Sequence, residues 1–253
     1  MTTDPKTTVI TGGADGIGWA MARLFAERGH SVIVADLDRD KAEARAAELG
    51  GDCSGVACDV TREEDVKRLA SSLSRCDVLI NNAGIGDSAK PTLEQDIGHF
   101  RAVLDVHLAG AFLCSREIGR LMIAQGSGSI VNISSIAGLD GIPGRNAYGA
   151  AKAGIAMMTK SLACEWASHG VRVNAIAPGY TRTALVEKLA AEGALDLDLI
   201  KRRSPMGRLV ESSELTEAAW FLASPAASAI TGAILSVDCG WAAFGAAGDA
   251  SAS

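Results

Sequence analysis

The chain has 253 residues, of which 30 are acidic and 24 are basic, so its formal net charge is −6. An acidic surplus argues against binding to nucleic acid or to anionic membranes, and we interpret the short basic cluster at 201–203 as a solvated helix end. No apolar run reaches the roughly 20 residues that span a bilayer, and residues 1–6 show no secretory pattern. We therefore expect a cytoplasmic protein.

Cysteine and histidine spacing predicts no metal site. The six cysteines, at positions 53, 58, 76, 114, 164 and 239, lack metal-ligand spacing, and the four histidines form no zinc motif. In a reducing compartment we interpret these cysteines as small apolar fillers. The length suits one α/β domain that buries about three quarters of its unfolded surface.

The first predicted element is a strand that leads through a glycine-rich turn into a helix. Residues 8–10 form an apolar run, and a helical pattern follows at 19–25. Glycines let the backbone approach a pyrophosphate, and the free amides of the following helix attract its charge. The turn thus predicts a dinucleotide site, with the candidate residues Gly12, Asp15, Gly16, Ile17 and Gly18.

The next apolar run, 31–36, ends in Asp36. A carboxylate at this distance from the glycine turn accepts hydrogen bonds from both hydroxyls of an adenosine ribose and would repel a 2′-phosphate. Asp15 places a second negative charge on the same side. The pair predicts NAD rather than NADP, and the alternative for Asp36 is an ordinary turn residue that ends a strand.

Later strands alternate with longer helices. Short β-branched runs at 78–80, 129–133 and 171–176 are separated by helical stretches, which predicts one Rossmann-type domain, a doubly wound parallel sheet with helices on both faces. Thr61–Glu64 resembles a capping box for a helix that extends through Leu73. Long apolar helices are expected at 100–125 and 147–169.

Tyr148 and Lys152 stand four residues apart in a run without proline, so a helix would present both side chains on one face. A phenol has a pKa of roughly 10, and a nearby ammonium favours the phenolate, which makes tyrosine usable as a base. Without other motifs the pair would be an ordinary surface pair.

Several motifs together, in this order and spacing, resemble the short-chain dehydrogenase/reductase family from about Thr7 to about Trp241. The resemblance implies catalytic roles for Ser135, Tyr148 and Lys152. It places Asp59 and Val60 beside the adenine and Asn82 near the ribose. Further residues that it implies for cofactor binding are Tyr148, Lys152, Pro178, Gly179, Thr181 and Thr183.

By this resemblance, Tyr148 takes the proton of a secondary alcohol while a hydride leaves the same carbon for NAD. Lys152 would stabilise the phenolate and hold the nicotinamide ribose, and Ser135 would orient the substrate oxygen. The predicted partner is a small-molecule alcohol or ketone, such as a polyol, hydroxysteroid or dihydrodiol. Two alternatives remain open: an NADPH-dependent carbonyl reductase, and a regulator that senses NAD without turnover.

One position departs from the family pattern. His107 stands where the family usually has asparagine, in a distorted helix segment whose backbone carbonyl binds a water that leads from the lysine to solvent. Its imidazole could join the proton path, so His107 is kept as a candidate catalytic residue. The alternative is that it only fills the space of the asparagine.

The substrate side is less specified. We expect residues 1–241 to form the NAD-binding domain, with a substrate-covering segment at about 182–209 and a flexible tail at 242–253. Some of the residues between the catalytic serine and tyrosine should border the substrate, and Arg145 either meets an anionic group or lies on the surface. The family resemblance and the long apolar helices predict a homotetramer.

Overall fold

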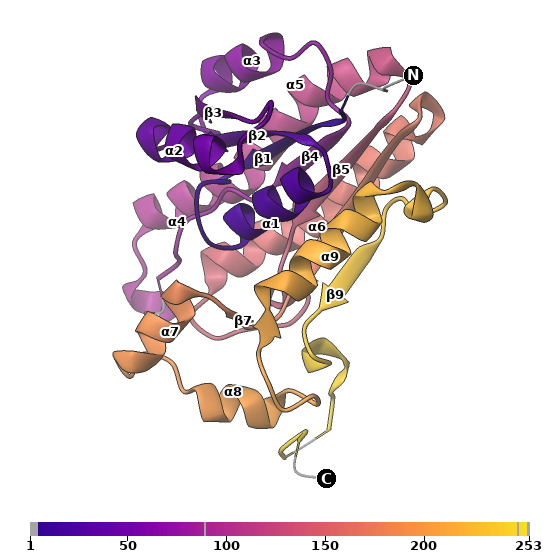
Figure 1. Ribbon diagram of the computed structural model, residues 1–253. Helices are drawn as coiled ribbons and strands as arrows, with labels where there is room; N and C mark the ends of the chain where they lie inside the picture. The colour runs from indigo at the N-terminus through magenta and orange to yellow at the C-terminus, as the bar shows by residue number, and fades with distance from the viewer. Residues whose placement is uncertain (1–4, 89, 247, 252–253) are drawn as a thin grey trace.

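A parallel sheet forms the centre of the computed structural model, which describes residues 5–88, 90–246 and 248–251 (Figure 1). In this described part, the seven strands of the sheet follow the order β3-β2-β1-β4-β5-β6-β9, and β7 pairs separately with β8. The strands are β1 (Thr7–Thr11), β2 (Ser31–Asp36), β3 (Ser54–Ala57), β4 (Val78–Asn81), β5 (Gly128–Ile133), β6 (Val171–Pro178), β7 (Thr181–Arg182), β8 (Val210–Glu211) and β9 (Ile234–Val237). The predicted doubly wound fold is confirmed.

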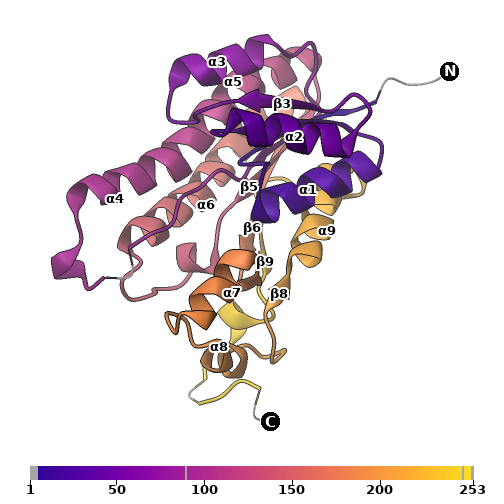
Figure 2. The same ribbon diagram turned by 60° about the vertical axis from the view of Figure 1, so that its left-hand side comes forward.

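Helices cover both faces of the sheet (Figures 1 and 2). Their bounds are α1 (Gly16–Glu27), α2 (Arg39–Leu49), α3 (Glu63–Ser71), α4 (Ile97–Leu104), α5 (Gly110–Gln125), α6 (Asn146–Trp166), α7 (Ala184–Ala191), α8 (Leu197–Arg203) and α9 (Ser212–Ala223). Shorter turns are η1 (Thr92–Glu94), the π-helical η2 (Asp105–Ala109), η3 (Ile136–Gly138), η4 (Ala167–His169), η5 (Pro225–Ala227) and η6 (Trp241–Ala243). Helices α1, α2 and α9 pack on one face, and α3, α5 and α6 pack on the other.

Alternation along the strands builds one core on each face. In β1, Ile10 packs with Phe25 of α1, whereas its neighbour Val9 packs with Ile118 of α5. All four side chains are fully buried, and burying an aliphatic or aromatic side chain of this size stabilises the fold by about 1.5–3 kcal/mol. Strands that are covered on both faces therefore lack a polar face, as expected for a parallel sheet.

A buried polar network ties α6 to the sheet. The Asn81 side-chain amide donates to Asn132 at 2.7 Å and to Ser115 at 2.9 Å, and Asn132 donates to Thr159 of α6 at 2.9 Å. Buried polar groups of this kind specify one packing arrangement when they are paired. The network fixes the position of α6, which carries Tyr148 and Lys152, relative to β4 and β5.

The predicted capping box at Thr61–Glu64 is wrong. Helix α3 starts at Glu63, its N-cap Arg62 makes no side-chain cap, and the helix ends at Ser71. The Thr61 amide and hydroxyl both donate to the Asp59 carboxylate, at 2.9 and 2.7 Å. Thr61 is therefore turned towards Asp59, and the residue in the N-cap position is Arg62, one residue further along the chain.

The long helix expected at 100–125 is interrupted by the π-helical turn η2, which contains His107. By length and composition, Ile97–Gln125 is apolar enough to cross a membrane, and 28% of the window that meets this test is buried. The sequence analysis found no such run, because polar residues divide it. Cys114, Ile118 and Met122 pack onto the sheet, so we interpret this stretch as a layer that covers one face of the sheet.

The segment predicted to cover the substrate lies beyond the carboxyl end of the sheet, and Figures 1 and 2 show its helix α8 near the C-terminal residues. Helix α7 has no buried residue, and α8 buries Ile200. The Arg203 guanidinium lies 4.9 Å from the ring centroids of both Trp241 and Phe244 and donates to their carbonyl oxygens. Part of the predicted tail thus packs on α8. Residues 247 and 252–253 of that tail, and residues 1–4, lie outside the described residues.

Candidate active site

The glycine turn connects β1 to α1, and two of its positions leave no room for a side chain. Gly12 has φ +60°, and a Cβ there would lie 2.9 Å from Ala83 Cα. A Cβ at Gly18 would lie 2.5 Å from Asn82 Nδ2 and would clash with the Gly12 carbonyl. At Gly16, with φ +52°, a Cβ would meet nothing within 4 Å. The turn therefore packs tightly against Asn82 and Ala83, whereas the space beside Gly16 is open. This arrangement leaves room for a pyrophosphate at the start of α1. Ile17 packs against the core from the same turn.

Asp36 lies at the end of β2, beside this turn. Its carboxylate accepts hydrogen bonds from the Ala14 amide at 3.1 Å and from the Asp38 amide at 3.3 Å. Asp15 caps α1, and its exposed carboxylate pairs with Lys41 at 2.6 Å. The Lys41 hydrogen bond is the main cause that lowers the pKa of Asp15. The two predicted acids therefore lie on the same side of the turn.

Asp59, Val60 and Asn82 lie in the loops after β3 and β4. Asp59 holds Thr61 as described, and Val60 is buried against Gly110 of α5. The Asn82 side-chain amide donates to the carbonyls of Thr11 and Gly12, at 3.1 and 3.0 Å. Asn82 thus contacts the glycine turn directly.

The loop after β6 closes the site on its other side. A Cβ at Gly179 would lie 2.8 Å from Asp238 Cα, so only glycine fits between this loop and the end of β9. The buried Thr181 hydroxyl donates to the Gly179 carbonyl at 3.0 Å, and Thr183 caps α7 by accepting from the Val186 amide at 3.3 Å. Pro178 is buried as the last residue of β6.

Ser135, Tyr148 and Lys152 converge between the end of β5 and the first turns of α6. The Ser135 hydroxyl hydrogen-bonds the Tyr148 side chain and also accepts from the Ala137 amide at 3.1 Å. Lys152 is 4% exposed, and its ammonium lies 5.4 Å from the Tyr148 ring centroid and donates to the Ile133 carbonyl at 2.6 Å. The predicted single face of one helix is confirmed.

Burial dominates the electrostatics of this group. It lowers the pKa of Lys152 to about 7. It also raises the pKa of Tyr148, whereas the hydrogen bond with Ser135 and the charge of Arg145 act in the lowering direction. The sequence analysis expected Lys152 to lower the pKa of the phenol. In the structure the cost of desolvating the phenolate is larger.

His107 is buried in η2, and its ring centroid lies 5.3 Å from that of Tyr148 in an edge-on arrangement. Nε2 lies 2.9 Å from the Ile85 carbonyl oxygen and 3.1 Å from its amide nitrogen. Burial, with Lys152 nearby, lowers the pKa of His107 to about 4. At neutral pH the imidazole is therefore uncharged, and it connects η2 to the loop after β4.

The sequence analysis missed two polar residues that contact the backbone of α6. Ser134 is buried, and its hydroxyl donates to the Lys152 carbonyl at 2.8 Å. Asp87 accepts from the Tyr148 amide at 3.1 Å. The only sequence signal for Asp87 was indirect: arginine, the residue before α6, is a poor N-cap, so the helix needed an acceptor from another segment.

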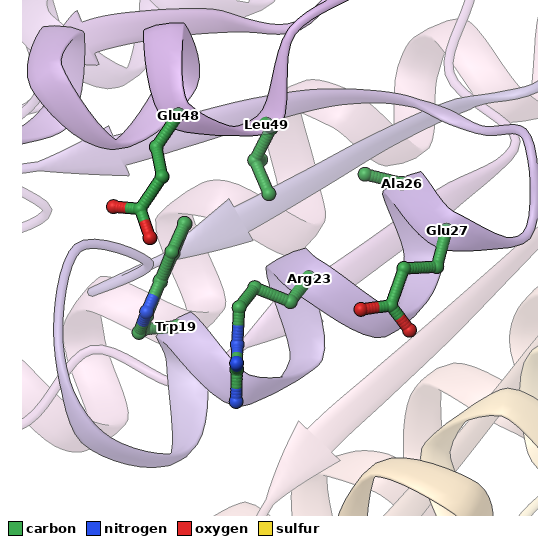
Figure 3. Close-up of a pocket in the computed structure, with 6 residues that line it drawn as sticks. All are labelled: Trp19, Arg23, Ala26, Glu27, Glu48 and Leu49. Atoms are coloured by element: carbon green, nitrogen blue, oxygen red, sulfur yellow. The ribbon is translucent and has the colours of Figure 1, made fainter.

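A separate cavity of about 210 Å³ lies between α1 and α2 (Figure 3). It is lined from α1 by Trp19 and Arg23 and from α2 by Glu48 and Leu49. It contains none of the predicted site residues. The chemistry predicted from the sequence therefore belongs to the carboxyl edge of the sheet and not to this cavity.

The chain matches the family described as Enoyl-(Acyl carrier protein) reductase over residues 12–242. It belongs to the short-chain dehydrogenase/reductase family. It is thus an oxidoreductase that acts on CH–OH groups with a nicotinamide dinucleotide, NAD or NADP. The chain is 43% identical over 242 residues to the cis-4-hydroxycyclohexanecarboxylate dehydrogenase of Sinomonas cyclohexanicum, covering 93% of this chain and 96% of that protein.

Other relatives show the same relationship. Identity to the galactitol 2-dehydrogenase (L-tagatose-forming) of Cereibacter sphaeroides is 39% over 246 residues, covering 94% of this chain and 95% of that protein. Identity to an uncharacterized short-chain type dehydrogenase/reductase of Sinorhizobium fredii is 44% over 240 residues, which is 93% of this chain but 43% of that protein. The solved structure of ElxO with NADP bound superposes with a TM-score of 0.89 at 33% identity, covering 95% of this chain and 100% of that one.

Proposed function

We propose that the protein oxidises a secondary alcohol to a ketone with NAD, and that Tyr148 is the acid-base group. The convergence of Ser135, Tyr148 and Lys152 carries this proposal. When bound, the nicotinamide accepts the hydride. Tyr148 takes the hydroxyl proton of the substrate, and Ser135 orients the substrate oxygen. Because the pKa of Lys152 is about 7, its amine can pass protons onward near neutral pH.

Charge around Asp36 supports NAD over NADP. The two cations of α2 that contact this turn each pair with a carboxylate, Lys41 with Asp15 and Arg45 with Glu48, so a 2′-phosphate would have to compete with these carboxylates. Asp36 itself would repel the phosphate. We expect NAD to bind at least about tenfold more tightly than NADP, and Asp36→Ala to narrow the difference. Calorimetry that gave tighter NADP binding would overturn this preference.

Two relatives whose names specify secondary alcohols, one on a cyclohexane ring and one on a polyol, support a proposal for the substrate class. We propose a secondary alcohol of this kind, with hydroxysteroids and dihydrodiols as further candidates. Appearance of NADH should be measured across such a panel with each cofactor, and Tyr148→Phe should lower turnover by about 10² or more. Near-normal turnover in that variant would contradict the assigned base.

A second candidate is an NADPH-dependent carbonyl reductase, because the similar ElxO structure holds NADP. The same panel distinguishes the two, since a reductase should consume NADPH faster with ketones than it forms NADH with alcohols. Regulation without turnover is the weaker alternative, since a sensor does not need the phenol. It would be supported only if no substrate turned over with either cofactor.

We also propose that the protein is a cytoplasmic homotetramer. Apolar side chains are exposed along the helices that cover one face of the sheet, with Ile97 61%, Phe112 44% and Met157 61% exposed. Closed symmetric assemblies bury such faces against a second copy. Light scattering should give about four times the chain mass of 26.0 kDa, and a stable monomer would refute the proposal.

A further inference from the structure

Helix α6 begins without a side-chain cap from its own segment. Its N-cap residue is Arg145, whose side chain makes no cap hydrogen bond. The first amides of a helix have no partner inside the helix, so they need acceptors from elsewhere. Asp87, in the loop after β4, supplies one: its Oδ2 accepts from the Tyr148 amide at 3.1 Å. The capped residue is thus the one that carries the phenol.

Asp87 is itself firmly held. Its side chain is 3% exposed, and its Oδ1 accepts from the Ser88 amide at 2.7 Å. The His99 ring nitrogen Nε2 lies 3.7 Å from the same oxygen. Gln95 joins the loop to the start of α6 by donating to the Gly144 carbonyl at 2.9 Å. A buried carboxylate with fixed partners is suited to orient the helix end that it touches.

We propose that Asp87 is a positioning residue for the reaction, which holds the first turn of α6, and with it Tyr148, against the loop after β4. This inference rests on the proposed role of Tyr148. Asp87 would thus be a fourth residue beside Ser135, Tyr148 and Lys152, and it would act through the backbone amide of Tyr148. Its carboxylate also places a negative charge beside the phenol.

Charged and titratable groups face Tyr148 from several elements. Arg145 lies directly before α6, Asp87 lies in the loop after β4, Lys152 lies one turn along α6, and His107 lies in η2. His99 faces Asp87 from α4 and adds positive charge only when it is protonated. After burial and the Ser135 hydrogen bond, Arg145 lowers the pKa of Tyr148 and Asp87 raises it. The two charges therefore have opposite effects on the same phenol.

Direct titration of the phenol tests this opposition without any substrate. The chain has two tyrosines, so Tyr180→Phe leaves Tyr148 as the sole chromophore for tyrosinate absorbance. In that background Asp87→Asn keeps an oxygen that can accept from the Tyr148 amide but removes the charge, and its titration midpoint should fall by about half a pH unit or more. The matched variant Arg145→Gln should shift the midpoint upward. Unchanged midpoints, or shifts in the same direction, would overturn the electrostatic part.

Kinetics tests the positioning part. Asp87→Ala removes both acceptor and charge, and it should lower kcat about tenfold while KM for the cofactor stays within about twofold. Asp87→Asn should retain most of kcat at its optimal pH, with the acid limb of the oxidation profile shifted to lower pH. If Asp87→Ala has the kcat and pH profile of the wild type, the proposal is wrong.

These outcomes are separable from the proposed function. An active Tyr148→Phe enzyme would remove the acid-base role of the tyrosine, yet the phenol titration would still report whether Asp87 and Arg145 act on it. An inactive Tyr148→Phe enzyme combined with an unaffected Asp87→Ala enzyme would remove only the role of Asp87. Should Asp87→Ala fail to fold, that failure would support the structural part of the role, and the titration of Asp87→Asn and Arg145→Gln would still decide the electrostatic part.

Discussion

The glycine turn and the substrate-covering segment are held in place by different means. In the turn, close backbone contacts at Gly12 and Gly18 leave no room for a side chain. The segment predicted to cover the substrate has few buried residues; β7 pairs with β8 at its two ends, and Arg203 of α8 contacts the rings of Trp241 and Phe244. The glycine turn is thus fixed by steric exclusion, and the predicted covering segment is held by a few contacts. Segments of the second kind are the ones that open and close over active sites.

The largest effect is expected in the glycine turn. Gly18→Ala would put a methyl group 2.5 Å from Asn82 Nδ2, which should cost about 3 kcal/mol or more and weaken cofactor binding by more than about tenfold. Gly16→Ala is the control, because its Cβ meets nothing within 4 Å, and it should cost only about 1–2 kcal/mol from its positive φ. Equal unfolding free energies for the two variants in urea would contradict steric exclusion.

His107, which packs against Tyr148, should make the stability of the folded protein depend on pH. The pKa of His107 is lowered by burial from 6.5 to about 4, so the unfolded chain binds its proton first as pH falls. The folded protein should therefore lose stability as pH falls from about 6.5 towards 4, by about 2 kcal/mol between pH 7 and pH 5. In His107→Asn this loss should be smaller. His169→Asn, at an exposed position, should behave like the wild type in urea unfolding at both pH values.

A more modest effect is expected at the end of α8. Arg203→Met should remove two cation–π contacts and two hydrogen bonds to carbonyls, which should cost about 1–2 kcal/mol and expose residues after 241 to proteolysis. Substrate KM should rise more than cofactor KM. Arg202→Met should change stability by less than about 0.5 kcal/mol, since its ion pair with Asp249 is about half exposed. Identical proteolysis rates in the two variants would show that the Arg203 contacts do not hold the residues after 241 in place.

The smallest effect concerns Cys239, the residue with a positive φ among the described non-glycine residues, at +56°. Its carbonyl accepts from the Met206 amide, so it lies where the covering segment meets the end of β9. Because a side chain is disfavoured in this conformation, Cys239→Gly should stabilise the protein by up to about 1 kcal/mol in thermal unfolding. Gly240→Ala should destabilise it, since that Cβ would lie 2.9 Å from Pro205 Cγ. A destabilised Cys239→Gly protein would mean that packing of the thiol outweighs strain.

Most of the fold and the site core were predictable because they depend on local patterns. Apolar strands, the glycine turn and the spacing of Tyr148 and Lys152 are visible in short windows of sequence, and the structure places them as expected. The roles assigned to these residues remain proposals.

Features that depend on the folded geometry of loops and on contacts between distant segments were missed. The threonine of the expected capping box is bonded to Asp59, the cap of α6 comes from Asp87, and the tail packs on α8 through Arg203. The pKa of Tyr148 was predicted in the wrong direction because the pattern shows the nearby cation but not the burial. Each of these depends on three-dimensional packing that residue spacing does not encode.

The order of strands has a consequence for biosynthesis. Strand β1 pairs with β2, which follows it closely, and with β4, which begins only at Val78. While the ribosome makes the part of the chain before Val78, β1 to β3 can assemble with α1 and α2, but one edge of β1 has no partner. Unpaired edges invite pairing with other chains. Nascent chains that stall before β4 should therefore depend on chaperones, and fragments that end before Val78 should aggregate when expressed alone.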